Sequence, residues 1–176
     1  MARKAEWVDF QPGATFRPEC EEIGWDGAHI YAFRCLYAGG MLPGKAREGA
    51  FIAHGGTEYR MYSGELLKKG NYEWVFARNG EVPPNAVAAG NDAHGNPYYF
   101  ARVIINQTLT PGHVDPSQKC CFIPYNGVAN RFTAYTVLCF KDVDCPKPRP
   151  EKPCPTTTSS RPRCDSGRLV ELNSIQ

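Results

Sequence analysis

The sequence contains two copies of one unit, and this internal repeat constrains the fold more than any other feature. Three blocks recur in the same order: Glu6-Trp7-Val8 with Glu73-Trp74-Val75, Tyr31-Ala32-Phe33-Arg34 with Tyr99-Phe100-Ala101-Arg102, and Phe51-Ile52 with Phe122-Ile123. The offset between the copies grows from 67 to 71 residues along the chain, which indicates a small loop insertion in the second copy. We expect the two units to cover residues 6–70 and 71–140.

The local pattern within each copy is typical of β-strands. Residues 29–37 and 98–105 are rich in aromatic and β-branched side chains and are followed by turn residues. Further strands are expected at 51–53, 59–67, 74–77, 120–125 and 132–140, and no stretch keeps a helical period. A unit this small buries little surface alone. The sequence therefore predicts an all-β fold of two tandem antiparallel units, related by a pseudo-twofold axis and packed as one compact body.

Residues 141–176 have a different composition, rich in proline and small polar residues, which predicts a tail or linker. Residues 168–172 could dock as a strand, although an unattached terminus is commoner. The tail cysteines, Cys145, Cys154 and Cys164, are not spaced like a zinc knuckle, and disulfides there would need an oxidising compartment. The other five cysteines lie among apolar residues and are expected to be small buried thiols.

Charge and hydropathy restrict the partners. Lys and Arg number 20 against 18 Asp and Glu, so the net charge of +2 favours neither nucleic acid nor an acidic membrane as a partner. No apolar run is long enough to span a bilayer. Glu6 and Asp9 interrupt the place where the core of a signal peptide would lie, so we expect a cytoplasmic protein, or one secreted by an unconventional route.

The second copy carries a set of motifs that points to a known family. Trp74 opens it, the turn Pro84-Asn85-Ala86-Val87 leads to Gly90 and Asp92, and the segments FIPYNG and YTVL follow. The first copy keeps Leu42-Pro43-Gly44-Lys45 and Gly55-Gly56-Thr57-Glu58 but lacks that turn. Over residues 6–140 the chain resembles the DM-nine repeat family, which is known from tandem-repeat invertebrate lectins and from natterin-type toxins.

The resemblance implies a mannose-binding lectin in which two side chains hold the sugar, an aspartate after the glycine turn and a lysine after Pro-Gly. By position, these are Asp92 with His113 in the second copy, and Asp26 with Lys45, beside Glu58, in the first. His113 replaces the lysine, and the second copy has lost the acid that corresponds to Glu58. We therefore expect the second site to be weaker or altered.

The chemistry of these side chains suits a neutral hexose, because a carboxylate accepts hydrogen bonds from vicinal hydroxyls and an ammonium donates to a hydroxyl oxygen. Lys45, directly after Pro-Gly, is expected at an exposed hairpin tip. Both charges also have simpler interpretations, since Asp92 could cap its own turn and Lys45 could be a solvated loop charge. Arg34 and Arg102 are expected to form internal ion pairs or stacks.

These observations favour a lectin that recognises mannose-containing glycans on cell or microbial surfaces, with agglutination or innate immune recognition as its role. Two sites, or a homodimer, would bridge a branched glycan. No catalytic residue, metal ligand or cofactor is predicted, because no acidic calcium loop and no catalytic motif occurs and the four histidines are scattered. The alternatives are a protein-binding scaffold or immune-response adaptor and, less favoured, a Cys/His enzyme.

Overall fold

The computed structural model describes residues 3–142. The expectations for the tail, namely a docked strand at 168–172 and a metal site or disulfides at Cys145, Cys154 and Cys164, lie outside the described residues. Within residues 3–142 the secondary structure consists of fourteen strands and no helix, so no helix there has the length and apolar character needed to cross a membrane. The expected all-β fold is confirmed.

The strands fall into two sets of seven. The first set is β1 (Trp7–Asp9), β2 (Glu22–Trp25), β3 (His29–Tyr37), β4 (Gly40–Ala46), β5 (Ala50–His54), β6 (Thr57–Met61) and β7 (Glu65–Leu67). The second set is β8 (Tyr72–Arg78), β9 (Ala88–Asn91), β10 (Pro97–Ile105), β11 (Thr108–Asp115), β12 (Cys120–Tyr125), β13 (Val128–Phe132) and β14 (Ala134–Phe140).

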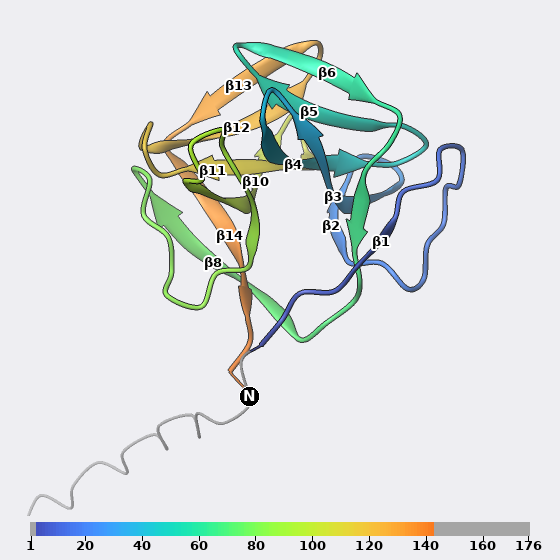
Figure 1. Ribbon diagram of the computed structural model, residues 1–176, viewed down its shortest axis with the longest axis horizontal. Helices are drawn as coiled ribbons and strands as arrows, with labels where there is room; N and C mark the ends of the chain where they lie inside the picture. The colour runs from blue at the N-terminus through green and yellow to red at the C-terminus, as the bar shows by residue number, and fades with distance from the viewer. Residues whose placement is uncertain (1–2, 143–176) are drawn as a thin grey trace, which may run out of the picture. The chain divides into compact units, whose positions relative to one another are not determined.

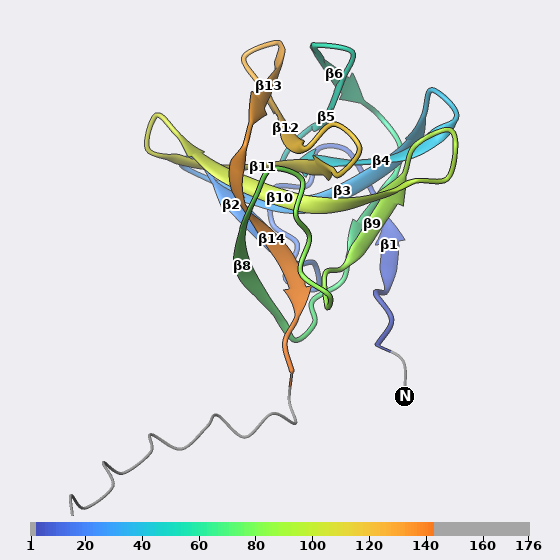
Figure 2. The ribbon, with the colours of Figure 1, turned by 90° about the vertical axis from the view of Figure 1, so that its left-hand side faces the viewer.

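The two sets pair in the same way, which establishes the pseudo-twofold relation. The hairpin β3–β4 corresponds to β10–β11, and Ala32 lies opposite Lys45 as Phe100 lies opposite His113. In the same manner β7 joins β1 to β3, and β14 joins β8 to β10. Figure 2 shows the two long hairpins crossing the body as curved ribbons, with the tips of β5–β6 and β12–β13 side by side at the top.

Strands of one copy also pair with strands of the other. Trp25 on β2 lies opposite Leu109 on β11, and by the same symmetry Met41 on β4 lies opposite Asn91 on β9. The hairpins β5–β6 and β12–β13 meet where Val128 faces Thr57. Eight strands consequently pair in a closed ring, in the order β3-β2-β11-β12-β13-β6-β5-β4 (Figure 1). Neither copy forms a separate barrel.

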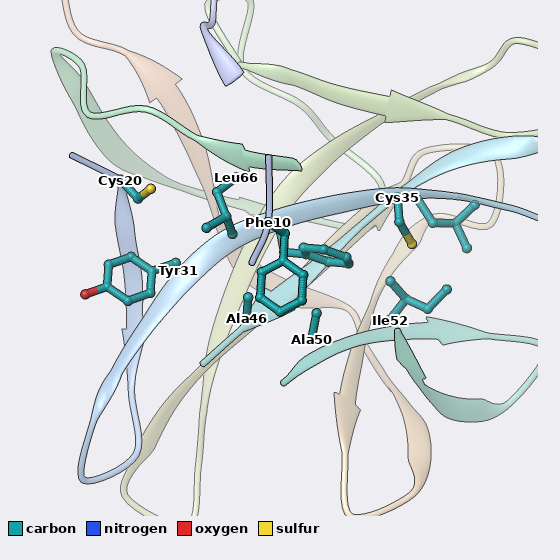
Figure 3. Packing of buried hydrophobic residues seen from close by; sticks show 10 residues of the cluster. Phe10, Cys20, Tyr31, Cys35, Ala46, Ala50, Ile52 and Leu66 are labelled. Carbon is teal, nitrogen blue, oxygen red and sulfur yellow. The ribbon is translucent and has the colours of Figure 1, made fainter. Parts of the chain in front are cut away.

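The buried side chains form three clusters. One, shown in Figure 3, belongs to the first copy. In it the rings of Phe10 and Phe33 pack edge to face with centroids 5.3 Å apart. A second belongs to the second copy. The third is built by both copies: Ile23, Ala32, Leu67, Val87, Ala89, Phe100 and Leu138. The two units thus share a core, as expected for repeats that each bury little surface alone.

Some predicted element boundaries were wrong. Residues 59–67 form two strands rather than one, because the chain turns between Met61 and Glu65. Gly64 allows this turn, since a Cβ there would meet the Arg34 carbonyl oxygen at 2.4 Å. Residues 132–140 are likewise divided between β13 and β14.

The Pro-Gly pairs are not hairpin tips, contrary to prediction. Pro43-Gly44 lies inside β4 and Pro111-Gly112 inside β11. The hairpins turn instead at Ala38-Gly39 and Asn106-Gln107, where all four residues have positive φ. Lys45 therefore projects from a central strand rather than from a loop.

The cysteine prediction is confirmed for the described residues. Cys20, Cys35, Cys120, Cys121 and Cys139 are all buried free thiols. They contribute to the cores as small apolar side chains.

Candidate functional site

A pocket of about 240 Å³, which we call the first-copy pocket, brings together three of the five predicted site residues: Asp26, Lys45 and Glu58. Asp26 follows β2, Lys45 lies on β4 and Glu58 on β6. The second copy completes the pocket with Tyr125 and Asn126 from the β12–β13 hairpin. The pocket is therefore a product of both repeats.

Lys45 is the central cation of this pocket, and only 15% of its side chain is exposed. Its Nζ lies 3.3 Å from Glu58 Oε1 and donates to the carbonyl oxygen of Pro124. It also lies 5.8 Å from the ring centroids of Phe51 and Tyr125. Burial lowers the pKa of the Lys45 ammonium, and Glu58 offsets part of that shift. An ammonium has three donors, so one is left for a ligand.

The two carboxylates are held from different directions. Glu58 Oε2 accepts a 2.7 Å hydrogen bond from the Gly127 backbone N–H, so the second copy orients this side chain. Asp26 Oδ1 accepts a 2.8 Å hydrogen bond from Arg47, a residue that the sequence did not single out because it lies in a run of loop charges. The pocket thus contains two cations and two carboxylates, which can donate to and accept from neighbouring hydroxyls.

An equivalent hollow of about 300 Å³, the second-copy pocket, is lined mainly by the second copy and is completed by the β5–β6 hairpin of the first. Strand register defines the equivalence, because Lys45 faces Phe51 across β4–β5 as His113 faces Phe122 across β11–β12. The expected site residue His113 lines this pocket and is 3% exposed.

Asp92, the other residue predicted for the second copy, does not line this pocket. Its carboxylate accepts three 2.8 Å hydrogen bonds, from the backbone N–H groups of His94 and Asn96 and from the Asn96 side chain. The Asn96 side chain is the main cause that lowers the pKa of Asp92. The structure therefore shows a turn-capping carboxylate, and the role of Asp92 toward a sugar stays a prediction.

His113 sits between two aromatic rings, with centroids 4.7 Å from Tyr98 and 5.8 Å from Phe122. Burial lowers the pKa of His113 to about 4, so the imidazole is neutral at physiological pH. Its Nδ1 is buried and has no hydrogen-bond partner among the described residues.

The buried His113 predicts a loss of stability in mild acid. The folded-state pKa lies below the ordinary value of 6.5, so the unfolded chain takes up the proton first and stability falls as the pH drops below 6.5. Between pH 7 and pH 5 this loss is about 2 kcal/mol. Urea unfolding at both pH values should show it in the unsubstituted protein, and His113→Leu should lack this component. Equal pH dependence in the two proteins would contradict the assignment.

Arg34 and Arg102 lie outside both pockets, as expected. The Arg34 guanidinium stacks 3.5 Å from the Trp7 ring centroid and the Arg102 guanidinium 3.9 Å from that of Trp74. Arg34 also pairs with Glu65 at 2.8 Å. The prediction of internal stacks and ion pairs is confirmed, and these contacts stabilise the packing of the repeats.

A larger hollow, of about 490 Å³, is lined chiefly by apolar side chains such as Phe76, Leu109 and Phe132. Arg102 is the one charged residue among its described lining residues. No group of three or more His, Cys, Asp or Glu side chains within residues 3–142 is placed to hold a metal ion. The first-copy pocket therefore has the richest set of polar groups among these hollows.

Comparison with known proteins agrees with the repeat and the fold. The crystal structure of the nematode sperm cell motility protein MFP2B is similar, with a TM-score of 0.61 and 15% sequence identity, over 82% of this chain and 48% of that chain. This chain thus spans about half the length of that structure, and at this identity the similarity shows the fold alone. No curated protein matches the sequence. The sequence profile of the DM9 repeat matches residues 24–143, more than half of the chain. The chain therefore belongs to the DM9 repeat family.

Proposed function

We propose that this protein is a non-catalytic carbohydrate-binding protein that takes mannose or mannose-terminated glycans, without a metal, in the first-copy pocket. One observation carries the proposal: Asp26, Lys45 and Glu58, which are far apart in the sequence, line a single pocket. The two carboxylates and the ammonium are the groups that the family resemblance implies for sugar binding.

The hydrogen-bonding capacity of the pocket supports a polyhydroxyl ligand. Lys45 has one donor beyond its contacts with Glu58 and Pro124. The Asp26 carboxylate uses Oδ1 for Arg47, and Oδ2 can accept from a ligand hydroxyl. The rings of Phe51 and Tyr125 give the pocket apolar walls, and small-ligand sites commonly combine such walls with a few convergent polar groups.

The thiols give little support to a Cys/His enzyme. Burial raises the pKa of Cys20, Cys35 and Cys139 to about 11, and that of Cys121 to about 12. A cysteine nucleophile reacts as its thiolate, and these thiols remain protonated at neutral pH. A binding function is therefore the better proposal for the residues that the structure describes.

The test is retention of the full chain on immobilised mannose, with and without a chelator. The unsubstituted protein should be retained in both cases. Lys45→Met removes the ammonium while keeping most of the side-chain volume, and it should weaken binding about tenfold or more, because charge-assisted hydrogen bonds are lost. Lys68→Met is the matched control, since Lys68 forms an exposed ion pair with Glu6 outside the pocket.

Far-UV circular dichroism and a thermal melt would show that Lys45→Met still folds. Equal retention of both variants would contradict the assignment of the pocket. Failure of the unsubstituted protein to bind mannose or any other immobilised glycan would contradict the lectin function itself and would favour the protein-binding scaffold. In that case deletion of residues 146–176 would show whether the tail recruits the partner.

A further inference from the structure

The second-copy pocket occupies the same position as the first-copy pocket but has a different balance of charges. The strand pairs Lys45–Phe51 and Ala46–Ala50 correspond to His113–Phe122 and Val114–Cys121. The next residue is Arg47 in the first copy and Asp115 in the second. The neutral His113 replaces Lys45, and Ala129 replaces Glu58, as shown by the symmetric bonds Glu58 N–H to Gly127 O and Ala129 N–H to Gly56 O.

The first-copy pocket contains two cations and two carboxylates, whose charges cancel. Among the described residues that line the second-copy pocket there is one carboxylate, that of Asp115, and no lysine or arginine. Two of the three substitutions remove or reverse a positive charge. The second-copy pocket therefore favours positive charge in a ligand more than its counterpart does.

Asp115 is a buried acid whose hydrogen-bond partners, Ser117 and Gln118, are neutral. The residue is 4% exposed, and its Oδ1 accepts from the Ser117 backbone N–H at 3.0 Å and from the Ser117 hydroxyl at 2.5 Å. The Gln118 side chain donates to Oδ2 at 3.0 Å. These dipoles hold the carboxylate in place but do not neutralise it, and a buried charge without a counterion is favourable only with such support or with a cation.

The walls of the pocket also suit a cation. Tyr98 and Phe122 line it on either side of His113, and aromatic faces attract ammonium groups through the ring quadrupole. Burial raises the pKa of Tyr98 to about 12, and the charges of Asp115 and Asp92 add to that shift, which indicates a negative potential at this wall.

His113 supplies an acceptor for a ligand N–H. A neutral imidazole has one donor nitrogen and one acceptor nitrogen. Nδ1 is buried and has no hydrogen-bond partner among the described residues, so we assign it as the acceptor. A donor on the ligand would satisfy it, and such unpaired buried groups are otherwise unfavourable.

We propose that the second-copy pocket binds an amino sugar, a ligand that carries a protonated amine. The first-copy pocket, in contrast, takes a neutral sugar. The ammonium lies against Asp115 and the Tyr98 and Phe122 rings, and an N–H or O–H of the ligand donates to His113 Nδ1. The absence of bulky side chains at Gly55, Gly56 and Ala129 leaves room for the ring.

The proposal is tested by titrating the full chain at pH 7 with three hexoses that differ at one position: glucosamine, N-acetylglucosamine and glucose. Calorimetry gives the affinities, and amide NMR shifts locate the site. We expect glucosamine to bind about tenfold or more tightly than the other two, because its ammonium makes a charge-assisted contact. The shifts should centre on Gly55, Gly56 and Ala129. Equal affinities, or shifts centred on Lys45, would overturn the proposal.

Ethanolamine, an amine without a sugar ring, is the further probe. We expect it to shift the same amides, which supports the amine assignment, and to bind less tightly than glucosamine, which supports an amino-sugar site. Asp115→Asn should reduce the glucosamine affinity about tenfold. Ala129→Lys places a competing ammonium in the pocket without altering the Asp115 turn and should reduce the affinity similarly. The control Glu73→Gln removes an exposed carboxylate of β8 and should change nothing. Unaltered binding by both pocket variants would refute the site.

This result is separable from the mannose experiment. Mannose retention is expected to depend on Lys45 and to weaken in Lys45→Met, whereas amine binding is expected to depend on Asp115 and to persist in that variant. Each pocket can thus fail its test without affecting the other.

Discussion

Replacing Phe100 by alanine is expected to lower the free energy of unfolding by about 4 kcal/mol, because it removes a fully buried aromatic ring and leaves a cavity. Phe100 is 0% exposed and lies on β10 in the core that the two copies share. Its ring centroid is 6.1 Å from that of Trp7, a residue of the other copy. The cavity would therefore open between the repeats, where both contribute to stability.

The control is Phe76→Ala, which removes the same kind of side chain from the surface of the same copy, where Phe76 is 65% exposed. Its expected effect is below about 1 kcal/mol, as for most surface substitutions. Urea unfolding followed by tryptophan fluorescence measures both variants. If Phe100→Ala lost no more free energy of unfolding than Phe76→Ala, the shared core would tolerate the cavity. The two copies would then be stabilised independently, contrary to this prediction.

The order of two residues explains why this position is so sensitive. The first copy reads Tyr-Ala-Phe-Arg and the second Tyr-Phe-Ala-Arg, so the equivalent of Phe100 is Ala32. Ala32 and Phe100 both belong to the shared core, while Phe33 and its equivalent Ala101 belong to the separate cores. One large side chain fills the centre and one fills the first-copy core. The exchange breaks the symmetry of the duplication without changing the strands.

The repeat and the all-β fold could be predicted because they depend on patterns that recur locally. The aromatic strands at 29–37 and 98–105 stand out from their turns, and the structure has them as β3 and β10. The strands β4 and β11 could not be found in this way. Each contains Pro-Gly, which is locally a turn signal, whereas the glycine is required by the close approach of the next strand along the chain.

The site was predictable only where one copy supplies it. Asp26, Lys45 and Glu58 follow from the family resemblance, and the structure brings them together. Tyr125 could not be anticipated, because it comes from the other copy; Lys45 donates to Pro124, 79 residues away in sequence. For Asp92 the resemblance implied a sugar-binding role, but its carboxylate accepts hydrogen bonds from the backbone of its own turn.

Gly112→Ala should have the second large effect, a loss of about 3 kcal/mol in the free energy of unfolding, because overpacking here meets backbone rather than a flexible side chain. A Cβ on Gly112 would lie 2.1 Å from the Phe122 carbonyl oxygen and 2.9 Å from Ile123 Cα. Strands β11 and β12 would have to separate. The neighbouring His113 would move with β11, so the second-copy pocket should also lose its shape.

The matched control for this steric argument is Gly55→Ala at the tip of β5–β6. Gly55 has a φ of +54°, and a Cβ there would meet nothing within 4 Å. Its loss should be about 1 kcal/mol, from left-handed backbone strain alone. Gly44→Ala, where the Phe51 carbonyl oxygen lies 2.1 Å from the added Cβ, should match Gly112→Ala because the symmetry of the repeats places the same approach in both copies. If all three variants lost the same free energy in urea unfolding, the close approach of the strands would not explain why glycine follows proline in both copies.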